Sequence, residues 1–152
     1  MLLNVSFGIF AFMPQGWLFM AAVILLEGLL LARLLTGHWV DKQFRLLALY
    51  TNAVSGVVGI LASMKLNGGW WLVVWFPWVS NNEIDLSQPN AARFLALYYA
   101  AAFILTLVLE ALFNVWFLRR DYPRRRVLTA TLLANVVSYA IGSAVLYAYS
   151  FS

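Results

Sequence analysis

Four long apolar runs constrain the fold of this chain more than any other feature. An α-helix rises about 1.5 Å per residue, so about 20 apolar residues cross the roughly 30 Å hydrocarbon layer of a bilayer. Each run reaches this length, the second with the help of Phe44, Ser63 and Met64. We therefore predict an all-α membrane protein whose single domain, residues 1–152, has four transmembrane helices. The runs are Trp17–Leu35, Leu46–Ala62, Phe94–Leu118 and Val127–Phe151.

The composition agrees with a membrane protein and excludes several other classes. Hydrophobic residues make up 64% of the chain and charged residues 11%, whereas soluble domains are about half apolar and a quarter charged. The chain has no cysteine, which rules out disulfides and thiolate metal sites. Most of the net positive charge falls in short loops, so we expect a lipid bilayer and no nucleic acid as partner. Residues 1–13 carry no Lys or Arg, and we expect no cleavable signal peptide.

The positions of Lys and Arg predict the orientation in the membrane. Eight of the ten lie in or beside two loops, residues 36–45 and 119–126, and only Lys65 and Arg93 lie towards the opposite end. Because Lys and Arg in short loops stay cytoplasmic, these loops are predicted to face the cytoplasm, with both termini and residues 64–93 outside. The eight are Arg33, Lys42, Arg45, Arg119, Arg120, Arg124, Arg125 and Arg126.

An aromatic segment, residues 65–93, joins the second and third spans on the outer side. Its tryptophan cluster is too short to cross a bilayer and is predicted to lie in the interface or dip into the bundle. The rings either anchor the segment at the headgroups, or form a lid over a cavity or a docking surface for a second copy or a membrane-protein partner. The tryptophans are Trp70, Trp71, Trp75 and Trp78.

Several residues are positioned to begin helices. Pro14 precedes the first apolar run, and Asp41 is predicted to cap the second helix. Ser87 or Asn90 is predicted to cap the third helix, and the sequence Asp-Tyr-Pro ending at Pro123 to open the fourth.

The chain contains an internal repeat. An offset of 83 positions places Glu27 on Glu110, and the same offset matches two polar residues and a glycine on the following helix. The repeats, about 12–64 and about 94–149, are two helical hairpins that begin on the same side. We predict parallel repeats, related by an axis along the membrane normal. The further matches are Asn52 with Asn135, Ser55 with Ser138 and Gly59 with Gly142.

The matched polar residues are predicted to meet near the middle of the membrane. Glu27 and Glu110 each lie about 14 Å from the cytoplasmic edge by helical rise, and the two asparagines lie at about 10 to 14 Å. Asn114 follows Glu110 by one turn and has no polar counterpart in the first repeat. The predicted ion-binding or substrate-binding residues are Glu27, Asn52, Ser55, Glu110, Asn114, Asn135 and Ser138.

Two interpretations of these residues stay open. Asn and Ser commonly join membrane helices by hydrogen bonds, and protonated Glu side chains that donate hydrogen bonds to Asn52 and Asn135 would make such a network static. A carboxyl group deep in the membrane is costly, however, which favours a working role. In the second interpretation the two Glu side chains titrate or bind a cation, with Asn carbonyl oxygens and Ser hydroxyls completing an oxygen-rich site.

Three functional hypotheses follow. The first is a transporter or channel for protons, a cation or a small polar solute. The second is a non-catalytic scaffold, assembly factor or accessory subunit of a larger membrane complex. An intramembrane enzyme is third, because His38 is the only histidine and lies in a loop, away from both Glu side chains. We expect no catalytic residues, no metal site and no cofactor.

Overall fold

The computed structural model describes residues 14–66 and 89–150, and the prediction of four helices is confirmed there. No strand occurs within these residues. Every helix begins a few residues before its apolar run. The helices are α2 (Pro14–Thr36), α3 (Lys42–Leu66), α5 (Pro89–Leu118) and α6 (Arg124–Ser150).

The two short loops carry residues that cap the helices beside them. Asp41 accepts a hydrogen bond from the Gln43 backbone N–H through Oδ1 at 2.8 Å, so the predicted cap of α3 is confirmed. Gly37 ends α2 with a φ of 83°, a left-handed conformation that favours glycine at this position. Pro123 directly precedes α6 and accepts from two backbone N–H groups of its first turn. Asn90 lies inside α5 and is not its cap, because the helix already begins at Pro89.

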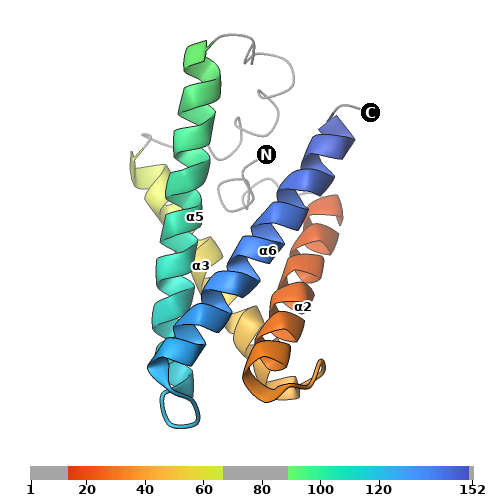
Figure 1. Ribbon diagram of the computed structural model, residues 1–152. Helices are drawn as coiled ribbons and strands as arrows, with labels where there is room; N and C mark the ends of the chain where they lie inside the picture. Colours follow the sequence, from red (N-terminus) through yellow and green to blue (C-terminus); the bar gives the residue numbers. More distant parts are fainter. Residues whose placement is uncertain (1–13, 67–88, 151–152) are drawn as a thin grey trace.

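The four helices form a ring in which each packs against two others. The order around the ring is α2, α3, α5, α6, so α2 lies diagonally across from α5 and α3 from α6. Both hairpins run down and back up in the same sense, and their two short loops lie together at one end of the bundle (Figure 1). We call this the loop end.

Some sequence predictions lie outside the described residues. These are the tryptophan cluster, Ser87 and the N-terminal segment 1–13. Within the part of the chain that is described, no helix combines the length and the apolarity that a membrane crossing requires. The transmembrane topology stays a prediction.

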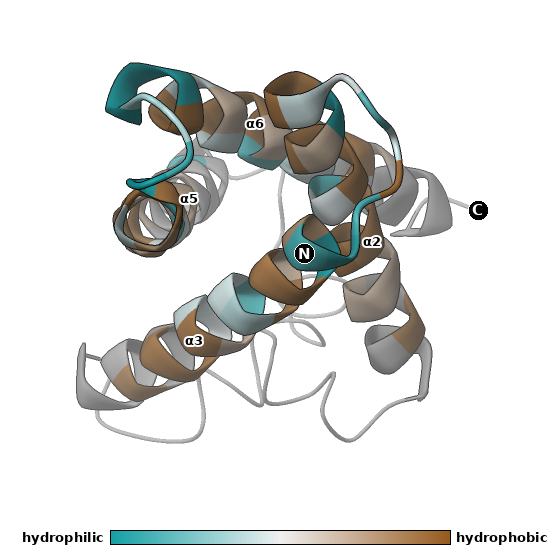
Figure 2. Ribbon diagram, turned by 90° about the horizontal axis from the view of Figure 1, so that it is seen from below, coloured by the Kyte–Doolittle hydropathy of each residue, from teal (hydrophilic) through white to brown (hydrophobic). Residues whose placement is uncertain are grey.

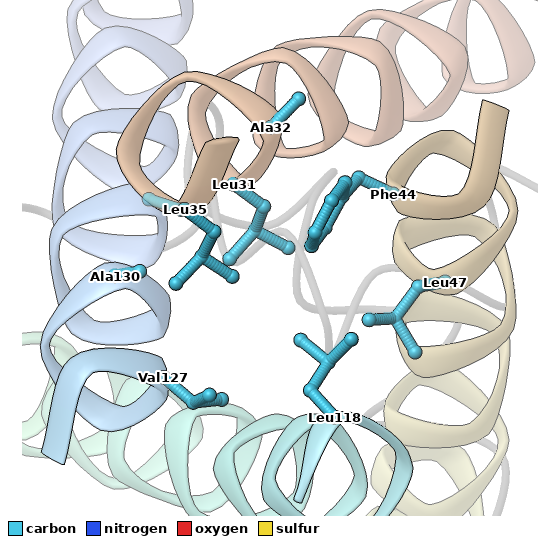
Figure 3. Packing of buried hydrophobic residues seen from close by; sticks show 9 residues of the cluster. Leu31, Ala32, Leu35, Phe44, Leu47, Leu118, Val127 and Ala130 are labelled. Carbon is cyan, nitrogen blue, oxygen red and sulfur yellow. The ribbon is translucent and has the colours of Figure 1, made fainter. Parts of the chain in front are cut away.

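A layer of apolar side chains fills the bundle at the loop end. Side chains from all four helices point towards its middle (Figure 3). Leu118 and Val127 have no exposed surface, and Phe44 and Leu35 have 2% or less. These four residues, which we call the apolar layer, are related in pairs by the 83-position offset, Leu35 with Leu118 and Phe44 with Val127. The repeat in the sequence therefore corresponds to an approximate two-fold symmetry of this layer.

The bundle buries polar as well as apolar side chains and exposes many large apolar ones. Buried polar side chains occur on all four helices, whereas many large apolar side chains are exposed. In Figure 2 the short loops are hydrophilic, and the helices are mostly hydrophobic with single hydrophilic positions between. The exposed apolar residues include Leu25, Leu49, Val57, Leu97, Ile104, Leu112, Trp116, Leu132, Val136 and Ile141.

Candidate functional site

Two buried carboxyl groups lie at the centre of the candidate site. Glu27 on α2 and Glu110 on α5 are each 2% exposed, and they extend into the bundle from diagonally opposite helices. The two carboxyl groups interact electrostatically, so a negative charge on both at once would be unfavourable. All seven residues predicted from the sequence to form the site are buried.

Each carboxyl group accepts a hydrogen bond from an asparagine of its own hairpin. Asn52 Nδ2 donates to Glu27 Oε2 at 2.5 Å, and Asn135 Nδ2 donates to Glu110 Oε2 at 2.8 Å. In both cases Nδ2 also donates to a backbone carbonyl four residues earlier, Ala48 O at 3.0 Å and Thr131 O at 3.1 Å. A backbone carbonyl only accepts, so this second bond fixes the orientation of the amide.

This orientation differs from the second interpretation of the sequence, in which Asn carbonyl oxygens complete an oxygen-rich site. The amide N–H groups of Asn52 and Asn135 face the carboxyl groups, so the Asn oxygens do not supply these contacts. The direction is also opposite to the alternative in which a protonated Glu donates to Asn. The cause is local, because the helix backbone places an acceptor beside each amide and thereby turns the N–H group inwards.

Each carboxyl group also contacts a serine of the other hairpin. Ser138 Oγ lies 2.6 Å from Glu27 Oε1, and Ser55 Oγ lies 3.3 Å from Glu110 Oε1. Each Glu therefore connects its own hairpin to the opposite one. All four side-chain contacts follow the 83-position offset, so the repeat in the sequence corresponds to a repeat in the hydrogen bonding.

Both serine hydroxyls lie beside two acceptors but have only one proton to donate. Ser138 Oγ is 3.0 Å from Asn135 O as well as close to Glu27, and Ser55 Oγ is 3.2 Å from Asn52 O as well as close to Glu110. If the hydroxyl donates to the ionised carboxylate, the backbone bond is given up. If it donates to the backbone, it can accept a hydrogen bond from the O–H of a neutral carboxyl group. Each Glu–Ser contact is therefore compatible with both protonation states.

One helical turn closer to the loop end, the two hairpins differ. The second hairpin has Asn114, whose Nδ2 donates to Thr131 Oγ1 at 3.0 Å, and both side chains are buried. The 83-position offset places Leu31 and Ala48 at the corresponding positions of the first hairpin. We call these four residues the middle layer. Asn114 Oδ1 and Asn135 Oδ1 are buried and have no hydrogen-bond partner among the described residues.

The apolar layer closes the site at the loop end. Leu35 and Leu118 each lie eight residues beyond a Glu of the cluster, and Phe44 and Val127 each lie eight residues before an Asn. Eight residues correspond to about 12 Å along a helix. The bundle therefore has three successive layers, with the carboxyl cluster first, the middle layer next and the apolar layer at the loop end.

Sequence reasoning missed several buried polar residues. Thr131 was overlooked although it precedes Asn135 by four residues and so lies on the same helix face. Thr51 and Thr106 are buried as well; Thr51 bonds to the backbone of its own helix, and Thr106 accepts from Tyr139 OH at 3.2 Å. Gly28 was also missed as a packing residue: a Cβ there would lie 3.1 Å from the Arg45 Cα, so α2 and α3 approach closely beside Glu27.

Comparisons with protein-family models, with curated protein sequences and with solved structures found no match.

Proposed function

We propose that this chain is a small membrane transporter that moves protons through the bundle, with Glu27 and Glu110 as the groups that take up and release them. Transport of another cation or a small polar solute coupled to these protons is compatible with the same site. The amide N–H groups that face both carboxyl groups favour the proton over a metal cation, because a metal ion needs oxygen ligands in those positions.

The observation that carries this proposal is the position of the two serine hydroxyls. Each can turn between a backbone carbonyl and a carboxyl oxygen, so a Glu can lose or gain a proton while its hydrogen-bond partners stay in place. A buried carboxyl group that must stay in one protonation state does not need such a partner. A group that exchanges protons during turnover does.

The proposed setting is a lipid bilayer. This part of the proposal depends on where the side chains lie and not on the apolarity of any single helix. Buried Glu, Asn, Ser and Thr together with exposed Leu, Val, Ile and Trp suit a bundle surrounded by hydrocarbon. The helices have 23 to 30 residues, which corresponds to about 34 to 45 Å.

The proposed orientation places the loop end in the cytoplasm. Exposed arginines are concentrated there, including Arg119, Arg120, Arg124 and Arg125. Short loops that carry several Lys or Arg residues stay on the cytoplasmic side during insertion. The apolar layer would then separate the carboxyl cluster from the cytoplasm in this conformation.

A scaffold or accessory subunit of a membrane complex is the second candidate. The observation that favours it is that each Glu connects the two hairpins, Glu27 through Ser138 and Glu110 through Ser55. A static network of this kind holds helices together without titrating. Docking of a partner on the tryptophan cluster belongs to this hypothesis and stays a prediction.

A flux assay separates the two candidates. The purified protein is reconstituted into liposomes that contain a pH-sensitive dye, and a potassium gradient with valinomycin supplies the driving force. The variant that combines Glu27→Gln with Glu110→Gln is expected to lose proton flux. Gln accepts from the Asn N–H group and donates to Ser as a neutral carboxyl group does, so the hydrogen bonds remain but the exchangeable acid is removed.

The matched control is Asp121→Asn, which removes an exposed carboxylate at the loop end and leaves the cluster intact. This variant is expected to retain the flux of the unmodified protein. Circular dichroism of all three proteins checks that they are folded. Proton flux that persists in the double Gln variant would refute the transport proposal and leave the scaffold.

A further inference from the structure

On the loop-end side of the carboxyl cluster, the middle layer gives the two hairpins different chemistry. We propose that the second hairpin binds a water molecule between the amide oxygens of Asn114 and Asn135, and that this water gives Glu110, but not Glu27, a path for its proton towards the loop end. The path deepens the proposed function and rests on it.

Two buried amide oxygens of the second hairpin lack a hydrogen-bond donor among the described residues. Asn114 is fully buried and Asn135 is 1% exposed, yet the Oδ1 atom of each lacks a hydrogen-bond partner among the described residues. Buried polar atoms are rarely left without a partner, because the loss of hydration is not otherwise offset. Each of these oxygens requires a hydrogen-bond donor. The amide nitrogens of the same two residues donate to other groups, Asn114 Nδ2 to Thr131 and Asn135 Nδ2 to Glu110.

The two oxygens belong to one compact set of side chains on adjacent helices. Glu110 and Asn114 are one turn apart on α5, Asn135 and Thr131 are one turn apart on α6, and a hydrogen bond joins the helices at each level. A water molecule donates two hydrogen bonds, which matches two carbonyl acceptors, and buried waters typically have about three polar partners. The other polar groups that these two asparagines contact are Thr131 Oγ1 and the Glu110 carboxyl group.

The first hairpin offers no comparable site. Leu31 and Ala48 replace Asn114 and Thr131 at the middle layer, and neither side chain has a polar atom. Leu31 is 2% exposed and Ala48 is 1% exposed, so the first hairpin has buried hydrocarbon at this level. Its middle-layer residues therefore offer no polar group to a proton on Glu27.

The transfer needs only the bound water and a second water molecule that enters from the loop end. The O–H bond of neutral Glu110 breaks as its proton bonds to the oxygen of the bound water, which gives a carboxylate and a hydrated proton. That hydrated proton releases one of its other protons to water that enters from the loop end, and no electron is transferred. Leu118 and Val127 of the apolar layer must separate for this second step, which makes them the gate of the path.

Hydrogen–deuterium exchange of the carboxyl groups tests the path without measuring transport. The protein in detergent micelles is transferred to D₂O, and the carboxyl C=O infrared band is followed in Glu27→Gln, which reports Glu110, and in Glu110→Gln, which reports Glu27. We expect Glu110 to exchange at least roughly tenfold faster, the effect of a modest difference in barrier height. Equal rates, or faster exchange at Glu27, would overturn the proposal.

Swapping the middle-layer residues of the two hairpins supplies the matched pair of variants. Asn114→Leu with Thr131→Ala, made in the Glu27→Gln background, gives the second hairpin the residues of the first and is expected to slow Glu110 to the Glu27 rate. Leu31→Asn with Ala48→Thr, made in the Glu110→Gln background, is expected to speed exchange at Glu27. A hydrogen–deuterium exchange rate at Glu110 that stays the same when Asn114 and Thr131 are replaced by Leu and Ala would also overturn the proposal.

The outcomes distinguish this path from the proposed function. Flux that depends on the two Glu residues together with equal exchange rates would reject the bound water and keep proton transport. Flux that survives the double Gln variant would reject proton transport whatever the exchange rates are. If the swapped variants do not fold, the comparison of the two single Gln variants still decides.

Discussion

The two hairpins resemble each other in the carboxyl cluster and in the apolar layer but differ in the middle layer between them. Glu27 and Glu110 have equivalent partners, and the apolar layer has equivalent leucines. In between, Leu31 and Ala48 of the first hairpin correspond to the hydrogen-bonded pair Asn114 and Thr131 of the second. The comparison indicates that the approximate symmetry of the buried cluster does not extend to the layer beside it.

The largest effect on stability is expected from replacing a cluster carboxyl group with an apolar side chain. Glu27→Leu leaves an Asn52 N–H group without a partner, and Glu110→Leu does the same to Asn135, at a cost of about 1 to 3 kcal/mol each. The Gln variants keep these bonds and should lose much less. Chemical unfolding in detergent micelles measures the difference; Gln variants as unstable as the Leu variants would contradict the hydrogen-bond assignment.

An intermediate effect is expected at the two loops. Asp41 caps α3, so Asp41→Ala should lower the free energy of unfolding by about 1 kcal/mol. Asp121 at the corresponding turn of the second hairpin is exposed, and Asp121→Ala should change stability by less than about 0.5 kcal/mol. Thermal unfolding followed by circular dichroism measures both. Equal losses would mean that the two loops are held by similar caps.

The smallest effect concerns the serines that connect the hairpins. Hydrogen bonds between membrane helices contribute about 0.6 kcal/mol on average, which sets the expected loss for Ser138→Ala. Ser55→Ala should cost less, because its hydroxyl lies 3.3 Å from Glu110 whereas that of Ser138 lies 2.6 Å from Glu27. Unfolding measurements on both variants in one detergent test the order, and the reverse order would contradict it.

The fold was largely accessible from the sequence because its signals are local. Long apolar runs, the Asp41 cap and Pro123 each determine structure within a few residues of themselves, and all are found where expected. The repeat was also visible, since Glu27 and Glu110 are the only carboxylates within the apolar runs. The starts of the helices were less accessible, because apolarity marks a run while the helix extends past it into polar residues.

The pairing within the site was not accessible in the same way. The sequence places Ser138 and Asn135 on one face of α6, but the contact of Ser138 with Glu27 depends on α6 being a neighbour of α2 in the ring. Helix order is a long-range property that hydropathy does not encode. The orientation of the Asn amides was missed for another reason, because it depends on a backbone carbonyl that any residue four positions earlier would supply.

The central claim is that the buried carboxyl cluster gains and loses a proton while the bundle stays folded. Infrared difference spectra between acidic and alkaline buffer test it most directly, with circular dichroism as the check of folding. We expect the protonated-carboxyl band of the cluster to be lost, and a carboxylate band to appear, on the change from acidic to alkaline buffer. This change is expected to be absent when Glu27→Gln is combined with Glu110→Gln. A folded protein whose cluster carboxyl bands are the same in both buffers would contradict it.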